Sequence, residues 1–402
     1  MKIILAFDSF KGSVSAIEAC LFAKAGIADV CPEAEIIEVP LADGGEGTVE
    51  TLVNATNGIL ISAPVYDPLG RLIEAQYGIL GDRETAVIEM SAAGGIMLLE
   101  PDEYNPMITS TYGVGELILS ALDRGCRKFI IGLGGSATND GGSGMLECLG
   151  FRFYDQNNQL LSGKGGSLKQ IVRIDQTLAD KRIHECRFDI ACDVTNPFYG
   201  REGATKVFAR QKGATPQILD ELEDGMISFA RIIAETRDID LNLVAGSGAA
   251  GGLGGAFVAF LNAKIHKGIE LILDRINFES WIKDADYIIT GEGKMDIQTL
   301  YGKVPFGVLQ EAHKAGVPVI GLCGTLEDSD SLNEAGFMAV FSILTECISL
   351  KEAMNKEYTG EAIQAVIRQI MRLLYKKEDE MLHPLFLLYP DLESRKLIKY
   401  TY

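Results

Sequence analysis

The chain has 402 residues, of which 47% are hydrophobic and 23% charged, a composition typical of a two-domain globular protein rather than of a disordered or fibrous one. Its 37 Lys and Arg residues face 56 Asp and Glu residues, and the net charge of −19 argues against binding to nucleic acid or to anionic membranes. No apolar run approaches the roughly 20 residues of a membrane span. The eight cysteines have no CxxC spacing, which favours reduced thiols and a cytoplasmic location.

The N-terminal sequence predicts two units of strand followed by helix. Residues 2–7 form an apolar run typical of a buried strand, and residues 15–28 have the periodicity of a helix. A second strand is predicted at residues 35–39, followed by a loop and a helix at residues 48–55. This alternation indicates a parallel sheet, which binds its ligands at the carboxyl ends of the strands.

The middle of the chain has a different pattern. From Gly58, short alternating runs with turn signals predict antiparallel hairpins, which indicates a second domain. Beyond Trp281 the alternation of strands and helices returns. Strands are predicted at residues 286–290 and 318–323, and helices at residues 304–315 and 361–374.

These patterns predict an α/β fold with a discontinuous first domain. Residues 1–58 and 285–402 are expected to form a Rossmann-like three-layer domain, and residues 59–284 an inserted mixed α/β domain. The active site is expected in the cleft between them. The segment after Lys376 has no regular period, and we assign it no function.

Polar residues follow both N-terminal strands. Asp8, Ser9 and Lys11 come directly after the first strand, where helix capping would explain the serine and the aspartate but needs no cation. Asp43 and Glu46 lie among glycines after the second strand, a pattern that suits recognition of hydroxyl groups or coordination of Mg²⁺. Plain turns are the alternative for each loop, but they do not explain why two such loops lie at adjacent strand ends.

Two glycine-rich loops are candidates for binding phosphate. Residues 132–142 follow a strand, so their backbone N–H groups could form an anion nest, and residues 246–255 precede a helix. The first loop also half matches a dinucleotide fingerprint, with Asp155 placed to bind a ribose, which would indicate an NAD-dependent oxidoreductase of a small hydroxy acid. Poor helix formers after that loop weigh against this alternative. Close helix packing is the alternative for the second loop.

Three further segments carry polar residues of the kind that phosphoryl transfer requires. Asp193 and Asn196 follow a predicted strand, where an Asx turn is the alternative, and Lys212 is an isolated cation. Residues 290–303 combine carboxylates and lysines in one loop after a strand, which suits phosphates, Mg²⁺ and an attacking hydroxyl. The four histidines lie outside every glycine loop, which argues against a nucleophilic triad.

Eight motifs resemble, in order, those of the type 1 glycerate kinase family, the bacterial glycerate 2-kinase type: DSFKGS, PLADGGEGT, NPMITSTYGVGELI, GLGGSATNDGG, CDVTNP, QKGA, GSGAAGGLGGA and TGEGKMDIQTLYGKVP. The resemblance covers residues 1 to about 375. It implies a two-domain α/β kinase that uses ATP and Mg²⁺ to convert D-glycerate to 2-phosphoglycerate. We expect a monomer or homodimer, and a non-catalytic sensor of phosphorylated acids is a further alternative.

The motifs that match the family give the candidate site residues. Catalytic roles are expected for Asp8, Lys11, Asp193 and Asp296. Substrate binding is expected for Ser9, Asp43, Glu46, Asn196 and Lys212. Phosphate or nucleotide binding is expected for Gly134, Gly135, Ser136, Asn139, Asp140, Gly248 and Lys303. Metal binding is expected for Asp193, Glu292 and Asp296.

Overall fold

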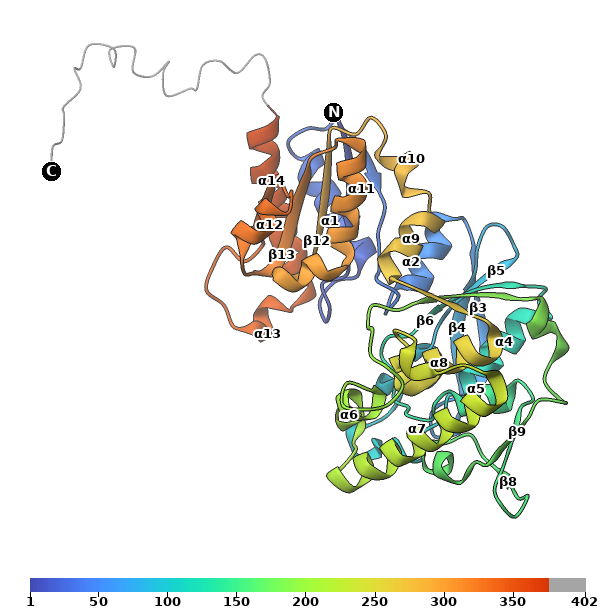
Figure 1. The fold of residues 1–402 in the computed structure, drawn as a ribbon. Helices are drawn as coiled ribbons and strands as arrows, with labels where there is room; N and C mark the ends of the chain where they lie inside the picture. The colour runs from blue at the N-terminus through green and yellow to red at the C-terminus, as the bar shows by residue number, and fades with distance from the viewer. Residues whose placement is uncertain (376–402) are drawn as a thin grey trace, which may run out of the picture.

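The computed structural model describes residues 1–375, which form an α/β structure with three sheets (Figure 1). The first sheet has the strand order β14-β13-β12-β1-β2, and every neighbouring pair is parallel. Its strands are β1 (Lys2–Phe7), β2 (Glu35–Glu38), β12 (Tyr287–Met295), β13 (Val319–Leu326) and β14 (Ala339–Ser342). The polypeptide therefore leaves this sheet after β2 and returns to it at β12.

Helices cover both faces of the first sheet, which explains the continuous apolar sequence of β1. Ile3 and Leu5 pack in the core that α1 and α14 cover, whereas Ile4 packs in the core that contains residues of α11. Ser15 and Glu18 form a capping box that fixes the start of α1. The helices near this sheet are α1 (Ala16–Ala28), α2 (Thr48–Ala55), α10 (Phe278–Ile282), α11 (Val304–Ala315), α12 (Ser329–Glu334), α13 (Leu350–Ala353) and α14 (Lys356–Leu374).

The second sheet is mixed and has the strand order β11-β10-β6-β5-β4-β3. Its strands are β3 (Ile59–Tyr66), β4 (Leu72–Ile79), β5 (Thr85–Glu89), β6 (Lys128–Gly132), β10 (Arg187–Ala191) and β11 (Lys264–His266). The β3–β4 and β4–β5 pairs are antiparallel, as expected for the hairpins predicted after Gly58, and the other three pairs are parallel. A small third sheet contains β7 (Arg152–Tyr154), β8 (Leu160–Leu161) and β9 (Arg173–Asp175).

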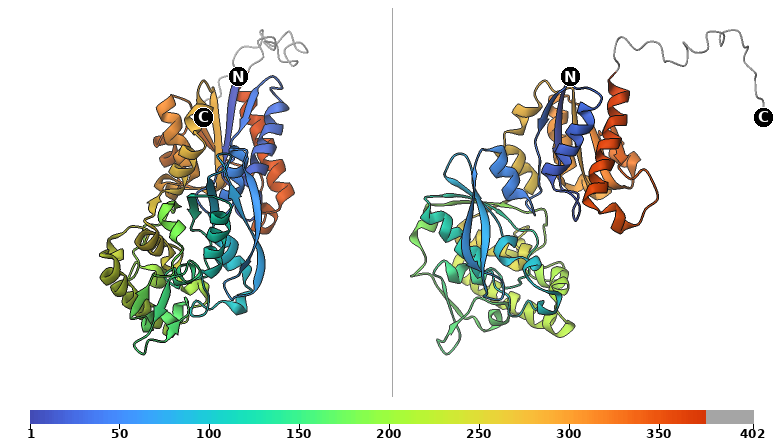
Figure 2. Two further views of the ribbon diagram at one scale, coloured as in Figure 1. Left: turned by 90° about the vertical axis from the view of Figure 1, so that its right-hand side faces the viewer. Right: turned by 180° about the vertical axis from the view of Figure 1, so that it is seen from behind.

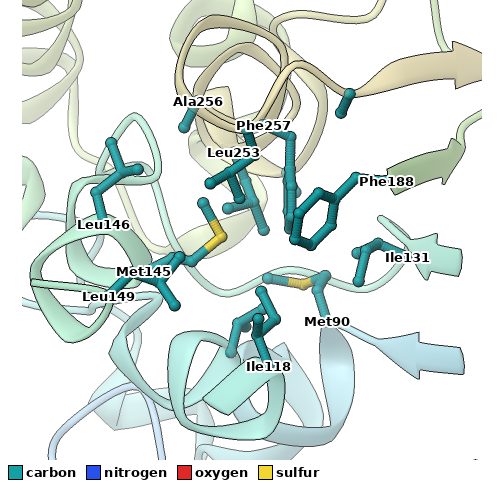
Figure 3. Close-up of a cluster of buried hydrophobic side chains, with 14 of the residues drawn as sticks. Met90, Ile118, Ile131, Met145, Leu146, Leu149, Phe188, Leu253, Ala256 and Phe257 are labelled. Carbon is teal, nitrogen blue, oxygen red and sulfur yellow. The ribbon is translucent and has the colours of Figure 1, made fainter. Parts of the chain in front are cut away.

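The largest hydrophobic core lies on one face of the second sheet (Figure 3). Phe188 of β10 stacks on Phe129 of β6, with ring centroids 4.7 Å apart, and it also contacts Phe257 of α8. Met145 of α5 and Ile118 of α4 fill the space opposite these rings (Figure 3). The helices around this core are α3 (Ser91–Gly94), α4 (Tyr112–Asp123), α5 (Ser143–Cys148), α6 (Ala204–Phe208), α7 (Pro216–Arg237) and α8 (Ala249–Leu261).

Two helices lie between the first and second sheets (Figures 1 and 2). They are α2 and α9 (Gly268–Arg275), and each contacts the second sheet. Val49 of α2 and Ile269 of α9 share one hydrophobic cluster with Ile4 of β1 and Ile130 of β6. This shared cluster holds the carboxyl ends of β1 and β10 close to each other.

The structure confirms the predicted α/β class, and it changes one predicted boundary that matters for the site. The sequence predicts that the strand at 286–290 ends in a loop, but β12 continues to Met295. It continues because Lys294 and Met295 pair with Thr325 and Leu326 of β13. No helix among residues 1–375 is long and apolar enough to cross a membrane, and the tail after Lys376 lies outside the described residues.

Candidate active site

Four acidic side chains from both large sheets line one cavity of about 480 Å³. Asp8 follows β1, Asp43 lies in the loop after β2, Glu292 lies in β12, and Asp193 follows β10. The strand order of the first sheet reverses between β1 and β12. The cavity therefore lies at the position where open α/β sheets bind their ligands.

Two of the three lysines that line this cavity pair with these carboxylates. Lys11 Nζ is 3.6 Å from Asp43 Oδ2, and Lys303 Nζ is 3.4 Å from Glu292 Oε2. Lys303 is the N-cap residue of α11, so the positive end of that helix dipole lies beside the cavity. The predicted residues that line this cavity together are Asp8, Ser9, Lys11, Asp43, Asp193, Glu292 and Lys303.

Local hydrogen bonds fix the two carboxylates of the first sheet. Asp8 is 4% exposed, and its Oδ1 accepts the N–H of Ser9 at 2.7 Å. The Asp8 N–H in turn donates to the carbonyl of Gly291, which continues the β1–β12 pairing to the site itself. Glu292 is 7% exposed and accepts the hydroxyl of Thr299 at 2.7 Å. Both carboxylates are therefore held by the backbone and by their neighbours before any ligand binds.

Close backbone packing holds the Asp43 loop against the second sheet. The Asp43 Oδ1 atom accepts the N–H of Gly45 at 3.0 Å, which forms a tight turn at the loop. A Cβ atom at Gly132, the last residue of β6, would lie 2.3 Å from the carbonyl oxygen of Gly44. Only glycine permits this approach, so Gly132, the first residue of the GLGG sequence, helps to position the Asp43 loop.

Asp193 is the carboxylate that the second sheet supplies to the cavity. Its Oδ1 atom accepts the N–H of Gly268, the first residue of α9, at 2.8 Å. A Cβ atom at Gly268 would lie 1.7 Å from the carbonyl oxygen of Asp43, so this glycine allows the two carboxylates to approach. Gly268 thus joins the loops that carry Asp43 and Asp193.

The protein excludes water from these carboxylates, and this raises their pKa values. Burial raises the pKa of Asp8 to about 7, and the negative charge of Asp43 adds to the shift. Loss of water around Asp193, although this side chain opens to the cavity, raises its pKa to about 6. Burial also raises the pKa of Glu292, whereas the Asp43 carboxylate raises the pKa of Lys11. A carboxylate with a pKa near 7 can accept a proton at physiological pH.

The three residues predicted to bind a metal ion do not all line the cavity. Asp296 does not line the cavity: it is the N-cap residue of the helix η7 (Ile297–Tyr301), and its Oδ2 lies 3.1 Å from Lys294 Nζ. Among residues 1–375, no three His, Cys, Asp or Glu side chains form a group that could hold a metal ion. The oxygen ligands in the cavity still fit Mg²⁺, which commonly binds one or two carboxylates and keeps its remaining positions for water and phosphate.

Several predicted residues lie outside this cavity. Glu46 lines a neighbouring cavity of about 800 Å³, which shares Ser9, Lys11 and Ser13 with the first one. The Asn196 amide donates to the carbonyl of Glu202 at 2.8 Å. Gly248 is buried, and a Cβ atom there would lie 2.1 Å from the carbonyl oxygen of Pro197. The backbone around Gly248 therefore packs against protein.

The predicted residues of the loop after β6 have two different surroundings. Gly134 and Gly135 are exposed, and Gly134 lies against Gly45 of the Asp43 loop. Asn139 and Asp140 are fully buried: Asn139 donates to the hydroxyl of Thr205, and Asp140 accepts four hydrogen bonds. The Asp140 donors are the Thr111 N–H and hydroxyl and the N–H groups of Gly142 and Gly144. Asp140 thus ties the loop to α4 and α5.

Lys212 is buried and donates hydrogen bonds to the same loop. It is 2% exposed, and its ammonium donates to Ser136 Oγ and to the carbonyl of Thr138, each at 2.7 Å. Burial lowers the pKa of Lys212 to about 7, although the nearby Asp140 opposes this shift. Substrate binding by Lys212 stays a prediction, because the ammonium points to the loop and does not line the acidic cavity.

Sequence reasoning assigned no individual role to three residues that shape the site, although Lys294 and Thr299 lie in the segment 290–303 that it singled out. Thr299 holds Glu292, Gly268 joins two loops, and Lys294 lines the cavity beside Lys303. The motif Asp296-Ile-Gln-Thr299 could have indicated the role of Thr299, because it forms a capping box that fixes the position of the threonine hydroxyl. Gly268 has no local signal, because its role depends on contact with a residue more than 200 positions earlier.

The fold and the cavity define an α/β enzyme whose carboxylates and lysines converge at the carboxyl ends of parallel strands, a site suited to a phosphorylated ligand. Residues 3–375 match the glycerate kinase family. The chain therefore belongs to the glycerate kinase family, a family of phosphotransferases.

Similar proteins have the same assignment. The chain is 45% identical to the glycerate kinase of Bacillus subtilis (strain 168), over 92% of this chain and 97% of that protein. It is 44% identical to the glycerate 2-kinase of Escherichia coli (strain K12), over 89% and 94%. A crystal structure of a protein assigned as glycerate kinase 2 from Salmonella typhimurium LT2 superimposes with a TM-score of 0.84 at 42% identity, covering 93% of this chain and 98% of that one.

Proposed function

We propose that this protein transfers the γ-phosphoryl group of ATP to D-glycerate and forms 2-phosphoglycerate. The observation that supports this proposal is the meeting of Asp8, Asp193 and Glu292 with Lys11 and Lys303 in one cavity, in a chain of the glycerate kinase family. Phosphoryl transfer depends mainly on positioning and on neutralising charge, and these side chains supply both.

In this proposal Asp8 accepts the proton of the attacking hydroxyl group. Its raised pKa, about 7, makes it a stronger base than an ordinary aspartate while it remains largely ionised at slightly alkaline pH. Lys11 and Lys303 bind the phosphoryl oxygens, helped by the N-terminus of α11. Asp43 orients Lys11 through their ion pair and contributes to substrate binding.

Mg²⁺ would bind Asp193 and Glu292. Asp296 pairs with Lys294 and does not line the cavity. When bound with ATP, the ion shields the phosphate charge and orients the γ-phosphoryl group. The raised pKa values of Asp193 and Glu292 fit this role, because burial disfavours their charged forms and a bound cation would stabilise them.

We further propose the two-domain arrangement expected from the sequence: a discontinuous Rossmann-like domain of residues 1–58 and 285–402 and an inserted domain of residues 59–284. Asp8, Asp43 and Glu292 belong to the first part and Asp193 to the second, so the site would lie in the cleft. Closure of such a cleft would exclude water and favour transfer over hydrolysis. A cytoplasmic monomer or homodimer is part of this proposal.

The NAD-dependent alternative has no support. Family membership disfavours it, and the fingerprint loop is not followed directly by a helix, since α5 begins only at Ser143. Asp155, the expected ribose ligand, accepts N–H groups of Asn157 and Gln159 in its own exposed turn. A nucleotide-binding titration in which NADH bound tightly and ATP did not would reverse this conclusion.

The deciding experiment mixes the purified protein with D-glycerate, ATP and Mg²⁺ and follows the product with enolase, which accepts 2-phosphoglycerate. A direct enolase signal is expected. A signal that requires added phosphoglycerate mutase would mean transfer to the 3-hydroxyl group. Binding of glycerate without ADP release would instead favour the sensor alternative, and turnover near that of the wild type in Asp193→Ala would refute the role of Asp193.

A further inference from the structure

Two cavities meet at the loop that carries Lys11, and they differ in charge. The acidic cavity described above is lined by three lysines and four carboxylates: Lys11, Lys294, Lys303, Asp8, Asp43, Asp193 and Glu292. The neighbouring cavity is lined by one lysine and four carboxylates: Lys11, Glu46, Glu50, Glu74 and Glu89. A nucleoside triphosphate is strongly anionic, so electrostatics favour the first cavity for its phosphates.

The first cavity also has an apolar end. Phe10, Ile343, Leu344, Leu350 and Met354 line it, and α13, which carries Leu350, lies on the side away from the second sheet (Figures 1 and 2). These residues come from the loop after β1, from the segment that follows β14, and from α13 and its C-cap. The cavity thus has apolar as well as charged walls, as a ligand with one ionic and one aromatic end requires.

The apolar wall is attached to the site at several points. The N–H of Ile343 donates to the carbonyl of Cys323 in β13, and Leu344 N–H donates to the hydroxyl of Ser342. A Cβ atom at Gly12 would lie 2.5 Å from Met354 Cε, which means that the Lys11 loop and the end of α13 touch. The distance between the apolar wall and Lys11 is therefore fixed by contact.

The two most exposed side chains of this wall are both apolar. Leu350 is 74% exposed and Met354 is 41% exposed, although both lie beside a charged cavity. A planar base that packs against them would bury apolar surface and gain affinity at about 25 cal/mol per Å². Methionine suits such a wall because its flexible thioether adapts to an aromatic ring.

We propose that this apolar end binds the adenine base of ATP, with the triphosphate extending over the β1–β12 switch point toward Lys11 and Lys303. This assignment rests on the kinase function proposed above and adds the location of the nucleoside. It also moves the nucleotide away from Gly248, since that glycine is packed against Pro197.

The test compares steady-state kinetics of Leu350→Glu with those of the wild type. A carboxylate at this exposed position would face the base and repel the phosphates, so KM for ATP should rise about tenfold, while KM for D-glycerate stays within about twofold. Leu72→Glu is the matched control, because Leu72 is 69% exposed on β4 and lines neither cavity. Its kinetic constants should equal those of the wild type.

Photolabelling with 8-azido-ATP locates the base without relying on turnover. Label in the peptides that contain residues 343–354 is the expected result. Label in residues 60–76, together with a raised KM for ATP in Leu60→Glu and an unchanged one in Leu350→Glu, would place the base in the neighbouring cavity and overturn the proposal. A wild-type protein that is labelled at 343–354 but releases no glycerate-dependent ADP would refute the kinase function and keep the nucleoside site.

Discussion

The Asp8→Asn substitution should reduce activity and increase stability at the same time. Asn keeps the size of the side chain and an oxygen that accepts the Ser9 N–H, but it cannot accept the proton of the substrate. Loss of a general base commonly lowers kcat by about 100-fold to 10,000-fold, so a fall in this range is expected. The KM for ATP should change little, because Lys11 and Lys303 remain in place.

The stability effect follows from the pKa of Asp8. Burial and Asp43 raise this pKa from 3.8 to about 7, a shift of about three pKa units, which corresponds to about 4 kcal/mol. The folded protein therefore retains a proton on Asp8 between pH 4 and pH 7 that the unfolded chain releases. This group makes the wild type less stable as pH rises through that window, and the loss is complete above pH 7. Asp8→Asn carries no such penalty.

Two assays at pH 8 test this reasoning. Urea unfolding should show the variant to be more stable than the wild type by a few kcal/mol, and the difference should shrink at pH 5. Coupled measurement of ADP release should show the loss of kcat, and the wild-type rate should fall below pH 7 as Asp8 becomes protonated. A variant that retains kcat within about threefold of the wild type would exclude Asp8 as the base, and equal stability at both pH values would exclude the perturbed pKa.

Three other substitutions probe the surroundings of the site. Lys303→Met should raise KM for ATP about tenfold, whereas Lys314→Met on the same helix, which removes only an exposed ion pair, should leave the kinetics unchanged. Between pH 7 and pH 10 the unfolded chain still binds a proton on Lys212 that the folded protein has released, so the free energy of unfolding of the wild type should rise with pH in this range. Lys212→Met should abolish this rise. Urea unfolding at pH 7 and at pH 10 measures it. Gly268→Ala should destabilise the protein by about 1–3 kcal/mol and lower kcat, because its Cβ would displace the Asp43 carbonyl; thermal unfolding and ADP release check both effects.

The sequence predicts the charged side of the site because the physics involved is local. A short apolar run that ends in Asp8 or Asp193 is recognisable as a strand followed by a polar loop, and parallel strands place such loops at one edge of the sheet. The position of Glu292 does not follow from local sequence alone. Glu292 lies inside β12 rather than in a loop, because pairing with β13 extends the strand, and that pairing joins segments about 30 residues apart.

The glycine runs show why the rest could not be predicted. A glycine-rich loop can either offer N–H groups to an anion or let two backbones touch, and the sequence does not distinguish these uses. In the structure, Gly251 and Gly252 take left-handed conformations and pack on the segment that contains Thr138 and Gly141. Only the tertiary contacts, which depend on the whole fold, assign this run to packing.

The same contacts explain how a protein with a net charge of −19 can present a site for phosphates. The fold gathers Lys11 from one end of the chain and Lys294 and Lys303 from a segment near the other end around carboxylates whose pKa values are raised mainly by burial. Such a site is unfavourable when empty and becomes more favourable when Mg²⁺ or other cations neutralise it. Burial of Asp8 and Glu292 is therefore a cost to stability, and in the function proposed above it would give the cavity a base near neutral pH and an affinity for Mg²⁺.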